Sequence, residues 1–143
     1  MKNQMKIPLW ITLFGGFLAV FGLALGVMGY LKPEMVIPGF TGDTNAHSMA
    51  IWMTSARNIA MGVVMIYALF SKQPALIGLA FLMRLVTEFF DMFGTAASGV
   101  MGVASPIIYA AYILLFIIPE IFAIKKMNEL TKEDQTTPLR VLQ

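Results

Sequence analysis

Four charged side chains lie within long apolar segments and are the strongest candidates for chemistry: Arg57, Arg84, Glu88 and Asp91. A charged residue at the centre of a membrane-spanning helix costs about 2.5–3.5 kcal/mol on insertion scales. We therefore expect all four to face inward and to pair, so that two positive and two negative charges cancel. Such a cluster indicates a polar ligand pocket or an ion path. It also suits a buried ion-pair network that only fixes the register of the helices.

Helical spacing brings these groups together. At 100° per residue, Arg84, Glu88 and Asp91 fall within about 60° of one another on one helix. The preceding segment has a second polar arc, formed by Thr54, Arg57, Asn58 and Met61, with His47 on the same arc if the helix extends that far. The faces opposite these arcs are apolar.

Depth also matches between the two segments. Arg57 lies 13 residues before Phe70, and Glu88 lies 14 residues after Pro74. At about 1.5 Å per residue, antiparallel neighbours would place them at nearly one level. We predict an ion pair between Arg57 and Glu88, with Arg84 bridging Glu88 or Asp91.

A fifth ionisable group, Glu120, follows Pro119 near the end of the last apolar segment. Proline cannot donate a backbone hydrogen bond, so it frees the Leu115 carbonyl and is expected to kink the helix. Glu120 either extends to water or pairs with Lys125, or it contributes to a cavity within the helices.

Three other polar rings lie near these segments. Tyr109 and Tyr112 are candidate cavity walls in the last segment. His47 lies near a membrane edge, where a loop or capping role is the simpler interpretation, and no nucleophile–base partner for it is recognisable.

Composition sets the class of the protein. Of 143 residues, 58% are hydrophobic and 13% are charged, against about 25% charged in soluble domains. The mean hydropathy is +0.76. The net charge is +2 and the basic residues lie at helix ends, a pattern without the basic stripe of a nucleic-acid-binding protein. Cys is absent and His47 is the single histidine, so we expect no metal and no cofactor. The remaining class is an integral membrane protein.

Four apolar segments predict the fold. They cover residues 7–31, 48–70, 74–93 and 106–124, each near the 20 residues needed to cross a bilayer. The first is too long for a signal peptide and is expected to be retained. Pro33 ends it, residues 94–102 form a short loop, and Pro74 and Pro106 begin helices. We predict one all-α transmembrane domain over 1–143, an up-down-up-down four-helix bundle with a polar cytoplasmic tail at 125–143.

The basic residues predict the orientation. One side of the predicted bundle carries Lys2, Lys6, Lys72, Lys125, Lys126, Lys132 and Arg140. The opposite side carries Lys32. The positive-inside rule then places both termini in the cytoplasm, as a multi-pass protein of the bacterial inner membrane.

Small residues form a stripe on the first segment at three- and four-residue spacing: Gly15, Ala19, Gly22, Gly26 and Gly29. Helices approach closely at such stripes. The stripe packs against the second or fourth segment of the same chain, or it forms the seam of a homodimer.

The motif Ser55-Ala56-Arg57-Asn58 with Gly62, followed by Arg84, Glu88 and Asp91, resembles the DoxX-like families. These are small four-helix bacterial membrane proteins. Some members resemble quinone-linked sulfur oxidoreductase subunits, and others associate with redox-stress complexes. The resemblance implies the same fold and makes Arg57, Asn58, Arg84, Glu88 and Asp91 the candidate functional residues. The absence of Cys argues against thiol chemistry.

Three functions fit these observations. The first is binding of a lipid- or quinone-like amphiphile, or service as an accessory subunit, with the charged cluster as polar anchor. The second is a proton-coupled transporter that works as a dimer, with Glu88 or Asp91 titrating. The third is a lipid-modifying, isomerase-like enzyme that uses Glu88 or Asp91 as acid or base, so enzymatic activity stays open. The expected partners are the lipid bilayer, an amphiphilic ligand, and a second copy or larger membrane complex.

Overall fold

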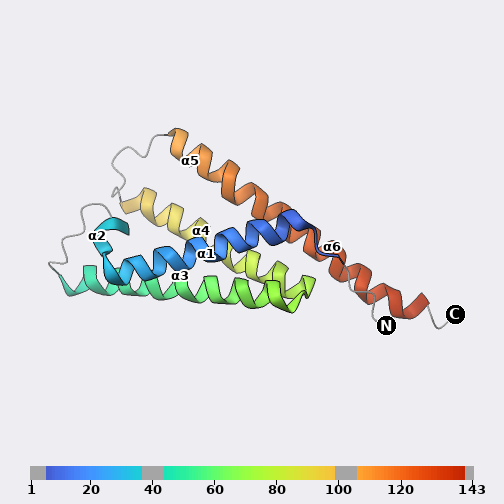
Figure 1. Ribbon diagram of the computed structural model, residues 1–143. Helices are drawn as coiled ribbons and strands as arrows, with labels where there is room; N and C mark the ends of the chain where they lie inside the picture. Colours follow the sequence, from blue (N-terminus) through green and yellow to red (C-terminus); the bar gives the residue numbers. More distant parts are fainter. Residues whose placement is uncertain (1–5, 37–43, 99–105, 141–143) are drawn as a thin grey trace. The chain divides into compact units, whose positions relative to one another are not determined.

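The computed structural model describes residues 6–36, 44–98 and 106–140. Every secondary-structure element in these ranges is helical, which confirms the predicted all-α class. The chain divides into two compact units (Figure 1). We call Pro8–Ser71 the N-terminal unit and the part from Lys72 onward the C-terminal unit. The single transmembrane domain over 1–143 stays a prediction.

The N-terminal unit is a helical hairpin. It contains α1 (Leu9–Leu31), the short α2 (Pro33–Val36) and α3 (Asn45–Ser71). α1 ends just before Lys32-Pro33, as predicted, and α2 lies between the first two predicted apolar segments. α3 ends at Ser71, where Lys72 takes a left-handed backbone conformation (φ 53°). A left-handed residue directly after a helix is a common helix stop.

The stripe of small residues on α1 is the packing surface for α3. All five of its residues, Gly15 to Gly29, are buried. A Cβ atom at Gly26 would lie 2.8 Å from the Ser55 carbonyl oxygen, and one at Gly62 would lie 2.9 Å from the Ala19 carbonyl oxygen. Only glycine permits such an approach of the two backbones. The packing of the stripe against the second segment of the same chain is confirmed. The formation of a homodimer stays a prediction.

The C-terminal unit begins with α4 (Pro74–Ser98). Pro74 is its first residue, as predicted, because proline lacks the N–H that the first helical turn leaves unused. The predicted end at residue 93 is wrong, since the helix continues to Ser98. Gly94 does not stop the helix. Its position is open, since a Cβ atom there would meet nothing within 4 Å. Glycine lowers the stability of a helix by only about 1 kcal/mol relative to alanine.

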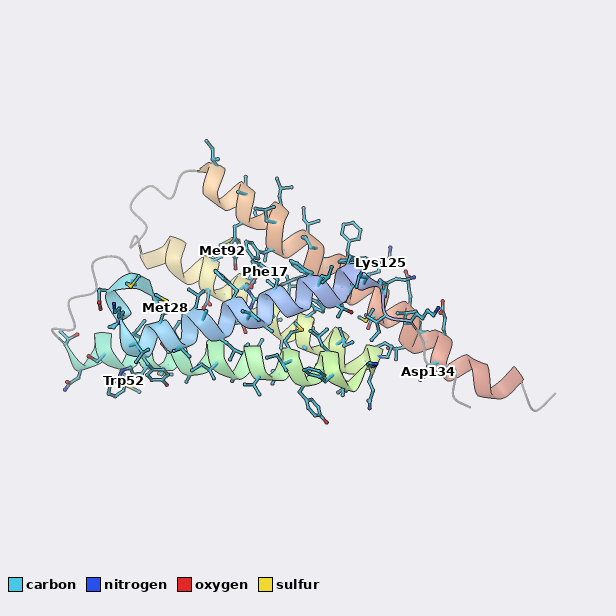
Figure 2. The ribbon with its side chains drawn as sticks, viewed as in Figure 1. Phe17, Met28, Trp52, Met92, Lys125 and Asp134 are labelled. Carbon is cyan, nitrogen blue, oxygen red and sulfur yellow. The ribbon has the colours of Figure 1, made fainter. Side chains whose placement is uncertain are left out.

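One continuous helical run follows, made of α5 (Pro106–Tyr112), the π-helical η1 (Ile113–Ile117) and α6 (Ile118–Arg140) (Figure 1). The last predicted apolar segment ends at residue 124, but its helix does not, since α6 continues to Arg140. The polar cytoplasmic tail over 125–143 stays a prediction. Lys125 and Asp134 mark the extension of α6 in Figure 2. It is helical because Ala123, Met127 and Leu130 lie on one face and are buried.

Among the described residues, two helices are long and apolar enough to cross a bilayer, α1 and the Ser48–Ser71 part of α3. α4 is of similar length but carries the charged residues Arg84, Glu88 and Asp91. Its opposite face is exposed and apolar, as predicted, and presents Leu82, Val86, Phe89 and Phe93. Figure 2 shows Trp52 projecting from α3, where its side chain is 58% exposed.

Candidate functional site

Two helices of the C-terminal unit position the site. α4 and α6 pack together. Gly78 faces Met127, with 3.1 Å between a Cβ atom built at Gly78 and that of Met127. Six residues further along α4, Arg84 contacts Glu120, which lies seven residues earlier on α6. From the first contact to the second, the residue number rises on α4 and falls on α6, so the two helices are antiparallel. The two contacts fix their register over about two turns.

Arg84 is the centre of the site. Its Nε donates to Glu120 Oε1 at 2.9 Å. Its Nη2 pairs with Glu88 Oε1, one turn further along α4. Tyr112, the last residue of α5, lies close enough to Glu88 for the two groups to interact electrostatically. We call Arg84, Glu88, Tyr112 and Glu120 the Arg84 cluster.

The Arg84 cluster is withdrawn from the surface of the chain. The side chains of Arg84 and Glu88 are 15% and 8% exposed, and that of Glu120 is fully buried. Glu120 uses one carboxylate oxygen for Arg84, and its Oε2 is buried without a hydrogen-bond partner among the described residues. Charge-assisted pairs of this kind are strong, but an unused buried acceptor is costly. Both Glu88 oxygens are also buried without a hydrogen-bond partner among the described residues, so the cluster has several unused acceptors.

The π-helical segment sets the phase between Tyr112 and Glu120. Its signature is the bond from the Ile118 N–H to the Ile113 carbonyl, five residues earlier instead of four. A regular α-helix would place residues 112 and 120 about 80° apart in azimuth. One π turn takes up about one extra residue, which reduces the offset to about 20°. Both side chains can then face α4.

Pro119 explains why this segment is π-helical. Proline has no N–H to give to the Leu115 carbonyl, and its ring clashes with that carbonyl in a regular helix. The disturbance predicted at Pro119 therefore takes the form of a widened turn directly before it. Such π turns occur frequently at functional sites.

Replacing Pro119 with Ala is expected to convert the π turn to α-helix and to rotate Tyr112 by about 100° relative to Glu120. The chain is free of Cys, so Glu88→Cys with Tyr112→Cys supplies the single pair of thiols for a short bifunctional reagent. Cross-linking should fall when Pro119→Ala is added. It should return when exposed Leu115 is also deleted, because the deletion removes the extra residue. Equal cross-linking in all three chains would contradict this role of Pro119.

The structure brings together only some of the residues singled out from the sequence. The pairing of Arg84 with Glu88 is confirmed. Asp91 is exposed, so the expectation that it faces inward is wrong in this chain. Glu120 is buried against Arg84, so its placement in water or beside Lys125 is wrong. Its contribution to a cavity stays a prediction.

The remaining candidates lie on other parts of the chain. Thr54, Arg57 and Asn58 are half-buried on α3, in the N-terminal unit. The predicted ion pair between Arg57 and Glu88 would join the two units, and it stays a prediction. His47 lies in the first turn of α3 and Tyr109 in α5, but their side chains are outside the described residues.

The burial of Glu120 could have been recognised from the periodicity of the sequence. The buried residues of α6 fall at 120, 123, 127 and 130, alternating steps of three and four. That spacing places the carboxylate on the packed face of the helix.

Comparisons of the chain with protein-family models, with curated proteins and with solved structures found no match. In the described residues, no group of three or more His, Cys, Asp or Glu side chains is arranged to hold a metal ion. The site is thus defined by its own geometry: a guanidinium held between two carboxylates, with a phenol beside them.

Proposed function

We propose that this chain is a four-span protein of the bacterial inner membrane, with both termini in the cytoplasm, and that it binds a lipid- or quinone-like amphiphile through the Arg84 cluster. The observation that carries the proposal is a buried polar cluster in a helix pair whose outer faces are apolar. A ligand with an apolar body and a small polar head group suits both parts of this surface.

The exposed surface supports the membrane part of the proposal. Large apolar side chains are exposed along every long helix, for example Phe17 on α1, Phe70 on α3, Phe93 on α4 and Phe122 on α6. Contiguous apolar surface of this extent is rare on soluble monomers. In a bilayer these side chains contact lipid, and the two less apolar helices α4 and α5–α6 bury their charges against each other.

The chemistry of the cluster supports the ligand part. Glu120 Oε2 is an unused acceptor, and the Tyr112 hydroxyl lies at the end of α5 next to the π turn. A hydroxyl or carbonyl head group can exchange hydrogen bonds with both kinds of group. The resemblance to DoxX-like proteins suggests a quinone as the first ligand to test, and an accessory role in a larger membrane complex is compatible with it.

Binding is tested with the purified full-length chain. A short-chain ubiquinone analogue and a phosphatidylglycerol should each be titrated while the melting temperature and native mass are recorded. Binding of either amphiphile should fall several-fold on Tyr112→Phe, which removes one hydroxyl and keeps the ring stacked on Phe116 at 5.0 Å between centroids. The control is Tyr67→Phe on α3, where the ring is 68% exposed. Equal loss in the two variants, or no binding by the parent, would rule out this site.

The orientation makes a separate prediction. A reporter that is active only in the periplasm should be silent when fused after Gln143, because seven of the eight Lys and Arg residues outside the apolar segments lie on the same side as that end. The same reporter inserted between residues 36 and 44 should be active. Activity after Gln143 would overturn the four-span topology.

A further inference from the structure

The charges of the Arg84 cluster do not balance. Arg84 supplies one positive charge, while Glu88 and Glu120 supply two carboxylates that both contact it. Asp91 lies one turn beyond Glu88 on α4 and adds a like charge that acts on Glu88. Tyr112 is neutral as a phenol. A buried anion without compensation costs several kcal/mol, so a cluster of this composition takes up one positive charge.

We propose that the Arg84 cluster binds one exchangeable proton, shared by its two carboxyl groups. A proton can supply the missing positive charge without a separate binding cavity. Two carboxyls that share one neighbouring cation cannot both ionise without penalty, as in other carboxylate pairs. The inference does not depend on the amphiphile, since it follows from the groups of this unit alone.

Burial indicates where the proton resides. Both carboxyls have oxygens without a hydrogen-bond partner among the described residues, but the Glu88 side chain pairs with Arg84 and keeps 8% exposure, which makes its ionised form less costly than that of a fully buried carboxyl. Glu120 faces one donor at Oε1, and its fully buried Oε2 has no hydrogen-bond partner among the described residues. A neutral O–H at Oε2 is less costly to bury there than an unsolvated charge. Glu120 therefore holds the proton, and Glu88 holds the negative charge opposite Arg84.

The proton is detectable by infrared spectroscopy of the full-length chain at neutral pH, in a detergent that contains no ester. The parent should show a C=O stretch of a protonated carboxyl, which disappears as the pH is raised. Glu120→Gln should abolish the band, and so should Glu88→Gln, because Glu120 is then the single anion beside Arg84. Glu129→Gln, which removes an exposed partner of Lys126, should leave the band unchanged.

A second measurement does not rely on the spectrum. If the native state holds a proton that the unfolded state releases, stability must fall as the pH rises. The melting temperature of the parent should decrease between neutral and alkaline pH, and Glu120→Gln should show a smaller decrease than the parent.

Two outcomes would overturn the proposal. The first is a parent without the band. If the band then develops in Arg57→Met, Arg57 compensates the second carboxylate of the cluster in the parent, and the parent needs no proton. The second is a band that persists in both Glu88→Gln and Glu120→Gln. Neither measurement uses an amphiphile, so failure of ligand binding and failure of proton binding are distinguishable.

Discussion

Arg84→Met should destabilise the C-terminal unit more than any other single change of a charged residue. It leaves the carboxyls of Glu88 and Glu120 buried without a counter-charge, whereas the guanidinium now contacts both. Breaking a buried pair by removing one partner costs about 3–5 kcal/mol. The free energy of unfolding, measured in mixed micelles, should fall by this amount. The matched control is Lys126→Met, which breaks the exposed pair with Glu129 and should cost at most about 1 kcal/mol.

The triple variant Arg84→Met, Glu88→Gln and Glu120→Gln separates charge from packing. It removes all the charges of the cluster at once, and buried ion groups can often be replaced by neutral groups of similar volume without loss. Most of the stability lost in Arg84→Met should return. If the losses were additive instead, the three residues would not interact in the folded chain.

Gly26→Ala should separate α1 from α3 and lower the unfolding free energy by about 1–3 kcal/mol, a typical cost of overpacking. A Cβ atom at this position would lie 2.6 Å from Ile59 Cγ1 and 2.8 Å from the Ser55 carbonyl oxygen. The carbonyl belongs to the backbone, so the helix itself must move. Gly16 lies on the same helix and a Cβ atom there meets nothing within 4 Å. Gly16→Ala should be neutral or slightly stabilising, because alanine favours helix.

Gly29 provides an independent check of the same interface. A Cβ atom there would collide with the Ser55 hydroxyl, which is a side-chain atom and can be removed. Gly29→Ala should therefore be rescued by Ser55→Ala, whereas Gly26→Ala should not be. Equal melting temperatures for Gly26→Ala, Gly16→Ala and the parent would show that α1 and α3 do not pack through this stripe.

Helix ends and contacts within one helix could be predicted because their causes are local. Pro74 begins α4 and Lys32-Pro33 follows the end of α1, since proline restricts its own backbone and that of the residue before it. The pairing of Arg84 with Glu88 required only the spacing of one helical turn. The small-residue stripe on α1 was equally visible as a periodic pattern.

The partner of Glu120 could not be predicted in the same way. Arg84 and Glu120 are 36 residues apart, and their contact depends on the register between α4 and α6. The π turn adds a shift in phase upstream of Glu120 that an assumption of regular helix omits. The helical tail was missed for a related reason, because its few buried apolar residues are outnumbered by charged ones.

The position of Glu120 along α6 also determines how strongly the membrane potential would act on a proton bound there. Glu120 lies five residues before Lys125, the first basic residue at the cytoplasmic boundary proposed for α6. At about 1.5 Å per residue this is about 7.5 Å of a hydrocarbon core about 30 Å thick. A proton that reaches Glu120 from the cytoplasm would cross only about a quarter of the electric field, worth about 0.6 kcal/mol per 100 mV. Its occupancy would thus follow cytoplasmic pH far more closely than voltage.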